Sequence, residues 1–417
     1  MRGLGALTLL CAFSASAGAV DDDNAAALAL SSAPIAEVAS ARASTATFEA
    51  AQTFAAQRGG EEADLQRLSV DARLDTRLAS GWRAVVAERI DAVWPGSFRG
   101  DEEVGTLKEA YIGWQPQADI LLDVGRINAR QGVAFGYNPS DFLRADAIRS
   151  LVSLDPDSLR DNRLGTVMAR SQFLWGSGAI TAAYAPKIAE RTSVATLDPD
   201  WGATNAHARW LLAVSQQIAP GLSPQWLAFG ETGRAPQVGM NLTAALGSST
   251  VAFLEISGGQ SPSLLSEAIS QPDPNSFRSR TASGFTYTFA NKLSLTFEYE
   301  HNGAGAGAAR WSQLRRGSLP IYARYREFAL AQQDLPTRSN AFVYTSWQDL
   351  VVQHLDLSAF VREDLIDHSR LSWWELRRHW TSVDFALRWQ TVQGGNSSDY
   401  GASPQRKVWQ LLFDYYL

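Results

Sequence analysis

Apolar and polar residues alternate along most of the chain. Between residues 67 and 78, apolar residues occupy the even positions, apart from Thr76, and polar or charged residues occupy the odd ones. The same period of two recurs at 82–94, 208–215, 237–246, 285–299 and 383–390. This period is typical of a β-strand that has one apolar and one polar face.

The alternation predicts 18 strands and the turns between them. The predicted strands are 45–56, 66–78, 82–94, 105–115, 119–127, 163–174, 178–187, 205–218, 223–231, 237–246, 250–257, 280–289, 293–301, 339–349, 352–362, 368–378, 382–391 and 405–417. Every second connection is then a tight turn, and three of the others are long: 128–162, 258–279 and 302–338. Short turns that alternate with longer loops are the rule for outer-membrane barrels, in which the turns face the periplasm.

Three features favour a membrane barrel over a soluble β-sandwich. The predicted strands run to roughly 10–13 residues, whereas strands of soluble proteins average about five or six. Their polar faces carry charges of both signs, as in a water-filled lumen. Trp82 and Trp94 share the apolar face at a separation of roughly 30 Å along the membrane normal, which suits two aromatic girdles. We therefore expect an all-β fold, a single transmembrane antiparallel β-barrel of about 18 strands (range 16–18) over residues 44–417.

The chain begins with an export signal. Arg2 supplies a positive charge, 4–13 is a short apolar run, and 17–19 reads Ala-Gly-Ala, a small-residue cleavage site. We assign 1–19 to a signal peptide and 20–43 to a periplasmic N-terminal segment that is expected to be disordered. At the other end, Trp409, Leu411, Phe413, Tyr415 and Leu417 alternate to the last residue. This pattern resembles the C-terminal signal that the barrel-assembly machinery recognises.

The charge balance points to a lumen with both signs. The chain has 37 basic and 43 acidic residues, so it lacks the basic excess of a nucleic-acid-binding protein. Charged residues on the polar strand faces are the candidates for lining and selectivity. They are Arg67, Asp71, Arg73, Asp75, Arg77, Arg83, Arg89, Asp91, Arg209, Glu298, Glu300, Arg362 and Arg388.

The longest connection, 302–338, is the predicted constriction. Connections longer than about 15 residues usually carry a function or are disordered. This one starts with a Gly-Ala hinge, and a short helix is expected over 321–332. We expect it to fold inward and to favour anions through five arginines: Arg310, Arg315, Arg316, Arg324 and Arg326.

A second long connection, 128–162, contains Asn138-Pro139-Ser140-Asp141, a strong turn former. Two interpretations stay open: it punctuates a surface loop, or it is an ordered turn that anchors an inward-folded loop.

Catalytic signatures are weak. The five histidines show no pair at metal-ligand spacing, and no G-x-S-x-G motif occurs. His354, Asp356 and Ser358 are expected on one strand face about 7 Å apart, which is too far for the direct hydrogen bonds of a triad. We predict no enzyme activity, no metal site and no cofactor.

Several segments resemble outer-membrane channel proteins related to porins and alginate-export-type barrels. They are Leu122-Asp123-Val124-Gly125-Arg126, 136–141, 298–305, 394–395 and 398–401. The resemblance implies a channel of about 18 strands in the outer membrane of a Gram-negative cell. Alginate-export-type barrels have an arginine-rich path for a polyanion, whereas the lumen predicted here carries about as many acids as arginines.

The function expected from these observations is a porin-like channel for passive or substrate-selective passage of small, including anionic, solutes. Two alternatives stay open: an export barrel for a polysaccharide or lipid-like substrate with a periplasmic partner, and an outer-membrane enzyme or surface-binding barrel with a blocked lumen. The expected partners are outer-membrane lipid and lipopolysaccharide, the assembly machinery, small solutes and, as an open alternative to a monomer, further copies of the chain.

Overall fold

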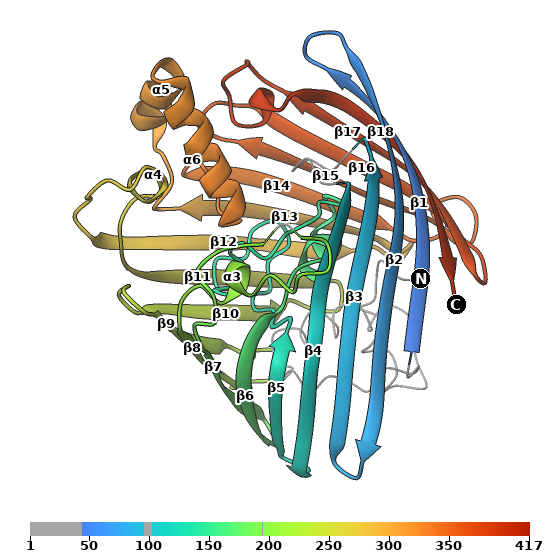
Figure 1. Cartoon of the computed structure of the whole chain (residues 1–417), viewed down its shortest axis with the longest axis vertical. Helices are drawn as coiled ribbons and strands as arrows, with labels where there is room; N and C mark the ends of the chain where they lie inside the picture. Colours follow the sequence, from blue (N-terminus) through green and yellow to red (C-terminus); the bar gives the residue numbers. More distant parts are fainter. Residues whose placement is uncertain (1–43, 96–101, 194) are drawn as a thin grey trace.

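A computed structural model describes residues 44–95, 102–193 and 195–417, and these form a closed antiparallel β-barrel of 18 strands (Figure 1). Strand β1 (Ser44–Gln57) pairs with both β2 (Glu62–Ala79) and β18 (Gln405–Tyr416), and this pairing closes the sheet. Closure satisfies the backbone hydrogen bonds of every strand edge, as a lipid environment requires. The predicted fold and strand number are confirmed. The signal peptide and the N-terminal segment predicted for 1–43 lie outside the described residues.

The remaining strands follow chain order around the barrel. They are β3 (Trp82–Trp94), β4 (Glu103–Gln117), β5 (Ile120–Ile127), β6 (Thr166–Trp175), β7 (Gly178–Ala185), β8 (Arg209–Gln216), β9 (Gln225–Glu231), β10 (Gln237–Ala245), β11 (Thr250–Ser261), β12 (Ser276–Thr288), β13 (Leu293–Asn302), β14 (Ser339–Trp347), β15 (Leu355–Asp364), β16 (Arg370–His379) and β17 (Val383–Gln393).

Short helices lie in the connections. They are α2 (Pro156–Asp161), α3 (Trp201–Thr204), α4 (Leu264–Ala268), α5 (Ala308–Arg316), α6 (Leu319–Ala331) and the 3-10 helix η2 (Tyr400–Ala402). None of the helices in the described residues is long and apolar enough to cross a membrane.

The period of two places the apolar residues on the outer surface of the wall. Leu78 is 59% exposed on β2 and Trp82 is 43% exposed on β3, whereas Arg89, at an odd position of β3, is 6% exposed. In a soluble protein this arrangement would be inverted. An apolar outer band around a polar interior is the arrangement that lipid on one side and water on the other would select.

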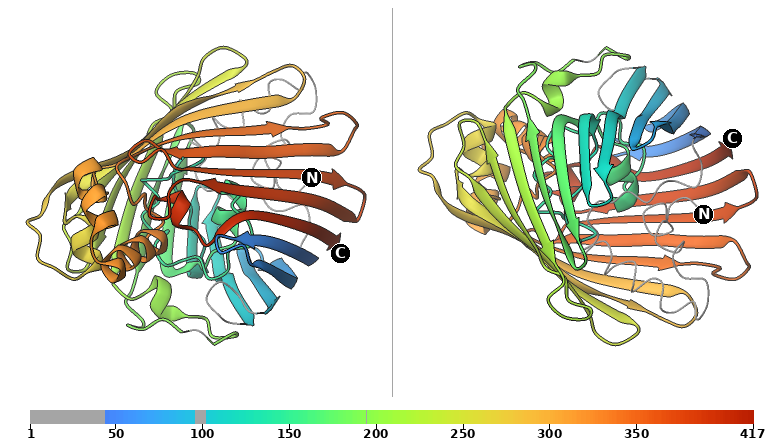
Figure 2. Two further views of the ribbon diagram at one scale, coloured as in Figure 1. Left: turned by 90° about the horizontal axis from the view of Figure 1, so that it is seen from above. Right: turned by 90° about the horizontal axis from the view of Figure 1, so that it is seen from below.

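The tight turns and the long loops occupy opposite ends of the barrel. Helices α4, α5 and α6 gather at one end, and the C-terminus lies at the other (Figure 2). One detail of the prediction was wrong: His354 belongs to the turn before β15, with a φ of 66°, and not to the strand that carries Asp356 and Ser358.

Candidate functional site

Residues 128–162, which make up most of the connection between β5 and β6, lie inside the barrel (Figure 2). Their polar groups bond to inward-facing side chains on strands from all around the wall. These side chains are Arg67 on β2, Lys108 on β4, Glu255 on β11, Glu298 on β13, Tyr344 on β14, Arg362 on β15 and Arg388 on β17. A single segment can reach walls on opposite sides only from within the lumen. We call it the inward loop.

Glu255 holds the first half of the inward loop. Its carboxylate accepts the backbone N–H groups of Val133 (2.9 Å), Ala134 (3.1 Å) and Ser140 (2.8 Å). It also accepts the hydroxyl of Ser140 at 2.9 Å. Glu255 is 0% exposed, so the backbone donors replace the water that a buried carboxylate needs.

Glu298 repeats this arrangement two strands away. It accepts the backbone N–H groups of Phe135 (2.9 Å), Gly136 (3.1 Å) and Tyr137 (3.0 Å). Arg362 donates both to the carbonyl oxygen of Gly136 and to the neighbouring carboxylate of Glu300. A Cβ atom at Gly136 would lie 2.3 Å from Glu300 Oε1, so any larger residue there would displace the side chains that hold the loop. We call Glu255, Glu298, Glu300 and Arg362 the loop clamp.

The second half of the inward loop meets the opposite wall. Arg388 and Arg67 both donate to the carbonyl oxygen of Val152, at 3.0 and 3.5 Å. Tyr344 donates to Asp155 at 3.3 Å, and burial together with Asp157 and Glu375 raises the pKa of Asp155 to about 7. The loop is therefore fixed at both ends.

Two charged side chains at the end of the inward loop stay accessible to water. The side chains of Arg130 and Asp161 are 37% and 54% exposed and form an ion pair at 3.3 Å. Asp161 also lies 3.4 Å from Lys108 of the wall.

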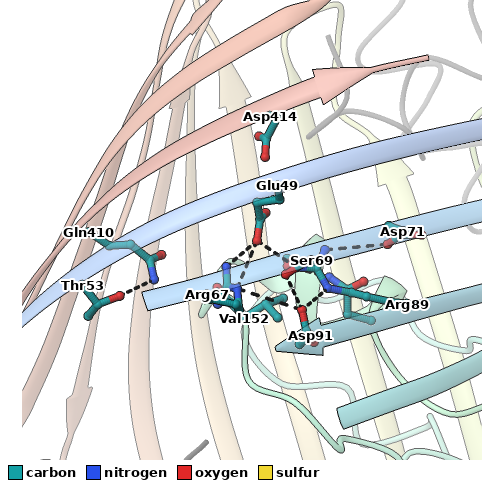
Figure 3. A network of polar contacts seen from close by, with 12 residues as sticks. Glu49, Thr53, Arg67, Ser69, Asp71, Arg89, Asp91, Val152, Gln410 and Asp414 are labelled. Atoms are coloured by element: carbon teal, nitrogen blue, oxygen red, sulfur yellow. Dashed lines mark hydrogen bonds and ion pairs between the residues drawn. The ribbon is translucent and has the colours of Figure 1, made fainter. Parts of the chain in front are cut away.

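The wall of β1 to β4 carries a network of paired charges (Figure 3). Glu49 on β1 binds both Arg67 and Arg89, the latter at 2.8 Å. Arg89 also binds Asp91 at 2.9 Å. Asp71 extends the network to Lys108 at 2.8 Å. Each cation here has carboxylate partners, so the network adds little net charge to the lumen.

A second network covers β15 to β18. Arg377 binds Glu375 at 2.7 Å and also binds Asp414, and Arg388 binds Glu375. His379 lies between Asp384 (2.9 Å) and Asp356 (3.3 Å). This wall too combines both signs.

The structure places most of the predicted lumen residues on the inner face. Arg67, Asp71, Arg73, Asp75, Arg83, Arg89, Asp91 and Arg388 belong to the wall networks. Glu298, Glu300 and Arg362 are covered by the inward loop and belong to the loop clamp. Arg209 is buried, and its Nε has no hydrogen-bond partner among the described residues. Arg77 is exposed near the turn that ends β2.

The structure does not bring the five arginines predicted for the constriction into the lumen. Segment 302–338 forms α5 and α6 at the loop end of the barrel (Figure 1). There Trp311 and Tyr325 pack with Leu264 of α4. Arg315 donates to Ser397, and Arg326 donates to the carbonyl oxygen of Asp399. Arg310, Arg316 and Arg324 are exposed. The helix predicted over 321–332 is present as α6, but the inward position belongs to 128–162.

Sequence reasoning missed Glu255, Glu49, Glu375 and Lys108. A signal for Glu255 existed in the sequence. The period of two in β11 places Glu255 on the same face as Val251 and Phe253, and all three are buried. The turn former at 138–141 was the other signal. The bonds from Ser140 to Glu255 support its interpretation as an anchor of an inward-folded loop.

Comparisons with solved structures show the same fold at low sequence identity. OccAB1 of Acinetobacter baumannii has a TM-score of 0.58 and 8% identity, over 90% of this chain and 96% of that one. OccK2 (OpdF) of Pseudomonas aeruginosa has a TM-score of 0.57 and 13% identity, and OccK8 (OprE) has 0.56 and 9%. Both cover 90% of this chain and 97% of their own. No protein-family model and no curated protein sequence matches the chain. The chain is thus similar to the Occ and Opd barrels in fold, and the alginate-export-type expectation finds no support.

Proposed function

We propose that the protein is an outer-membrane channel through which small solutes pass passively, narrowed by the inward loop. The observation that carries this proposal is the seating of 128–162 inside a closed 18-stranded barrel with a polar inner wall. Barrels of 16–18 strands leave an aqueous path when loops do not fill them. The structural neighbours are outer-membrane porins of Gram-negative bacteria, which agrees with this assignment.

The inward loop suits a permanent constriction better than a mobile gate. Eight hydrogen bonds join it to the carboxylates of Glu255 and Glu298 alone. Hydrogen bonds to charged groups contribute about 1.5–3 kcal/mol each. Several such bonds acting together would hold one conformation, so we expect a steady open level of current with few closures.

The paired charges of the lumen wall determine which selectivity between anions and cations we expect. Porin neighbours of this fold pass small solutes that are often anionic. Here Arg67, Arg89 and Lys108 all have carboxylate partners within 4 Å. We therefore propose a narrow path that selects by size and by the placement of charges on the solute, with a chloride-to-potassium permeability ratio close to unity.

Single-channel recording in planar bilayers tests this function. The purified protein should give discrete, long-lived conductance steps and a reversal potential near zero in a potassium chloride gradient. A protein that inserts and gives no steps is a blocked barrel, and the channel proposal fails. We further propose that the barrel has no enzyme activity, in line with the channel proteins that share its fold.

A further inference from the structure

A cleft of about 190 Å³ lies outside the lumen, at the loop end of the barrel. One side comes from the connection between β11 and β12, which contains α4, and the other from the start and end of segment 303–338. Its charged lining consists of Arg278, Arg310, Arg338 and Asp273. We call it the loop-end cleft. It is distinct from the channel and does not depend on the proposed function.

The charges of the loop-end cleft do not balance. Arg278 is paired with Asp273 at 3.2 Å. Arg310 bonds to the neutral side chain of Gln313 at 3.3 Å. In the described part of the chain, no carboxylate lies within 4 Å of Arg310 or Arg338. Three guanidinium groups and one carboxylate leave an excess of two positive charges in one small space.

The floor of the cleft is rigid. Tyr325 is 0% exposed, accepts the backbone N–H of Ala306 at 3.1 Å and donates to the carbonyl oxygen of Pro336. Gly305 crosses so close to Thr337 that a Cβ atom there would lie 2.7 Å from its carbonyl oxygen. Opposite the floor, Ser263 donates its backbone N–H to Asp273 at 2.7 Å. The arginines therefore project from a framework that is fixed before any ligand binds.

We propose that the loop-end cleft binds a doubly charged oxyanion, such as a phosphate monoester. The planar, forked donors of arginine match the oxygens of phosphate and carboxylate groups. An excess of two positive charges matches a dianion, and the volume leaves room for a sugar-sized substituent. The same chemistry occurs in a free solute and in the phosphorylated sugars of lipopolysaccharide, which surround the loop end of an outer-membrane barrel.

Titration calorimetry of the detergent-purified protein tests the free-solute source, with inorganic phosphate and glucose 6-phosphate as probes and glucose as the neutral control. Arg310→Gln with Arg338→Gln should weaken binding of glucose 6-phosphate roughly tenfold or more. Arg324→Gln is the matched control, because Arg324 is exposed on α6 and does not line the cleft. Added salt should weaken binding to the wild type.

Phosphate analysis of lipopolysaccharide that copurifies with the barrel tests the lipid source, in the same variants. If the wild type binds glucose 6-phosphate and the double variant does not, the proposal is supported with a free solute as the ligand. If the wild type does not bind glucose 6-phosphate, but less lipopolysaccharide copurifies with the double variant than with the wild type, the proposal is supported with the lipid as the ligand. If neither quantity differs between wild type and double variant, the proposal is overturned. Heat-dependent migration on SDS gels first establishes that each variant is folded.

Asp273→Asn gives an independent check of the charge argument. The asparagine oxygen can still accept the N–H of Ser263, while one negative charge is removed. Affinity for whichever ligand binds should therefore increase. A decrease would contradict an electrostatic site.

Discussion

The carboxylate of Glu255 on β11 and residue Ser140 of the inward loop make two hydrogen bonds, from the backbone N–H at 2.8 Å and from the hydroxyl at 2.9 Å. This contact joins the barrel wall to a turn 115 positions earlier in the chain. It explains why a turn-forming tetrapeptide lies within a long connection. The contact also identifies the groups whose removal should loosen the constriction.

Glu255→Gln should destabilise the seating of the inward loop by about 2–4 kcal/mol. An amide nitrogen cannot accept the N–H groups of Val133, Ala134 and Ser140, so at least one donor is left unpaired in a buried site. We expect noisier open-channel current, with excursions to higher conductance. Glu327→Gln, on the exposed face of α6, is the control and should leave the current unchanged. Equal noise in both variants would argue against the loop clamp.

Ser140→Ala should give a smaller effect in the same direction, of about 1 kcal/mol. The hydroxyl bonds to Glu255 and Asn241 are lost, but the backbone N–H of residue 140 still reaches the carboxylate. The open-channel current should be least noisy in the wild type, noisier in Ser140→Ala and noisiest in Glu255→Gln. More noise in Ser140→Ala than in Glu255→Gln would mean that the hydroxyl, and not the backbone N–H groups that bond to Glu255, holds the turn.

The channel should depend on pH through Asp155. Because burial, Asp157 and Glu375 raise its pKa to about 7 from an ordinary value near 4, the neutral form favours the seated loop. Stability of the seated loop is therefore greatest near pH 4 and below, is lost as the pH rises to about 7, and is constant above about pH 8. Conductance fluctuations should increase from about pH 4.5 to about pH 7.5 and then level off. Asp155→Asn should abolish that dependence, and a dependence that survives in Asp155→Asn belongs to another group.

Assembly should depend on which face of β18 receives a charge. Phe413→Asp puts a carboxylate on the outer face, where Phe413 is 49% exposed, at a cost of up to a few kcal/mol depending on depth. Gln410→Asp puts the same carboxylate on the inner face beside Arg388, which already bonds to Gln410 at 3.1 Å. Surface protease accessibility in cells should fall for Phe413→Asp and stay normal for Gln410→Asp. Normal surface levels of both variants would contradict the outward orientation of Phe413.

The strands and the faces of their residues could be predicted because both follow from a local property. Each outward residue meets lipid and each inward one meets water, so alternation marks the wall without knowledge of any partner. For this reason the sequence places Arg67, Asp71 and Arg89 on the inner face. In the structure each of them forms an ion pair there with a residue of another strand.

The choice of the loop that enters the lumen could not be predicted in this way. Segments 128–162 and 302–338 are both long and rich in turn-forming or flexible residues. The difference lies in contacts that only the closed barrel creates: Glu255 and Glu298 offer carboxylates to the first, whereas α4 offers an apolar surface to Trp311 and Tyr325 of the second. Arginine content indicated the second loop, but those arginines find partners or solvent at the loop end.

Single-channel conductance of two matched loop deletions tests the central claim. Ile127 pairs with Thr166 and His301 pairs with Ser339, so a short Gly-Ser linker can replace 131–162 in one variant and 308–330 in the other without moving a strand. The second deletion keeps Gln333 and Asp334, which bond to Arg144 of the inward loop. The account predicts a conductance several times that of the wild type when 131–162 is removed. It predicts a conductance near that of the wild type when 308–330 is removed. A large increase in the second variant with none in the first, or no current through any of the three barrels, would contradict it.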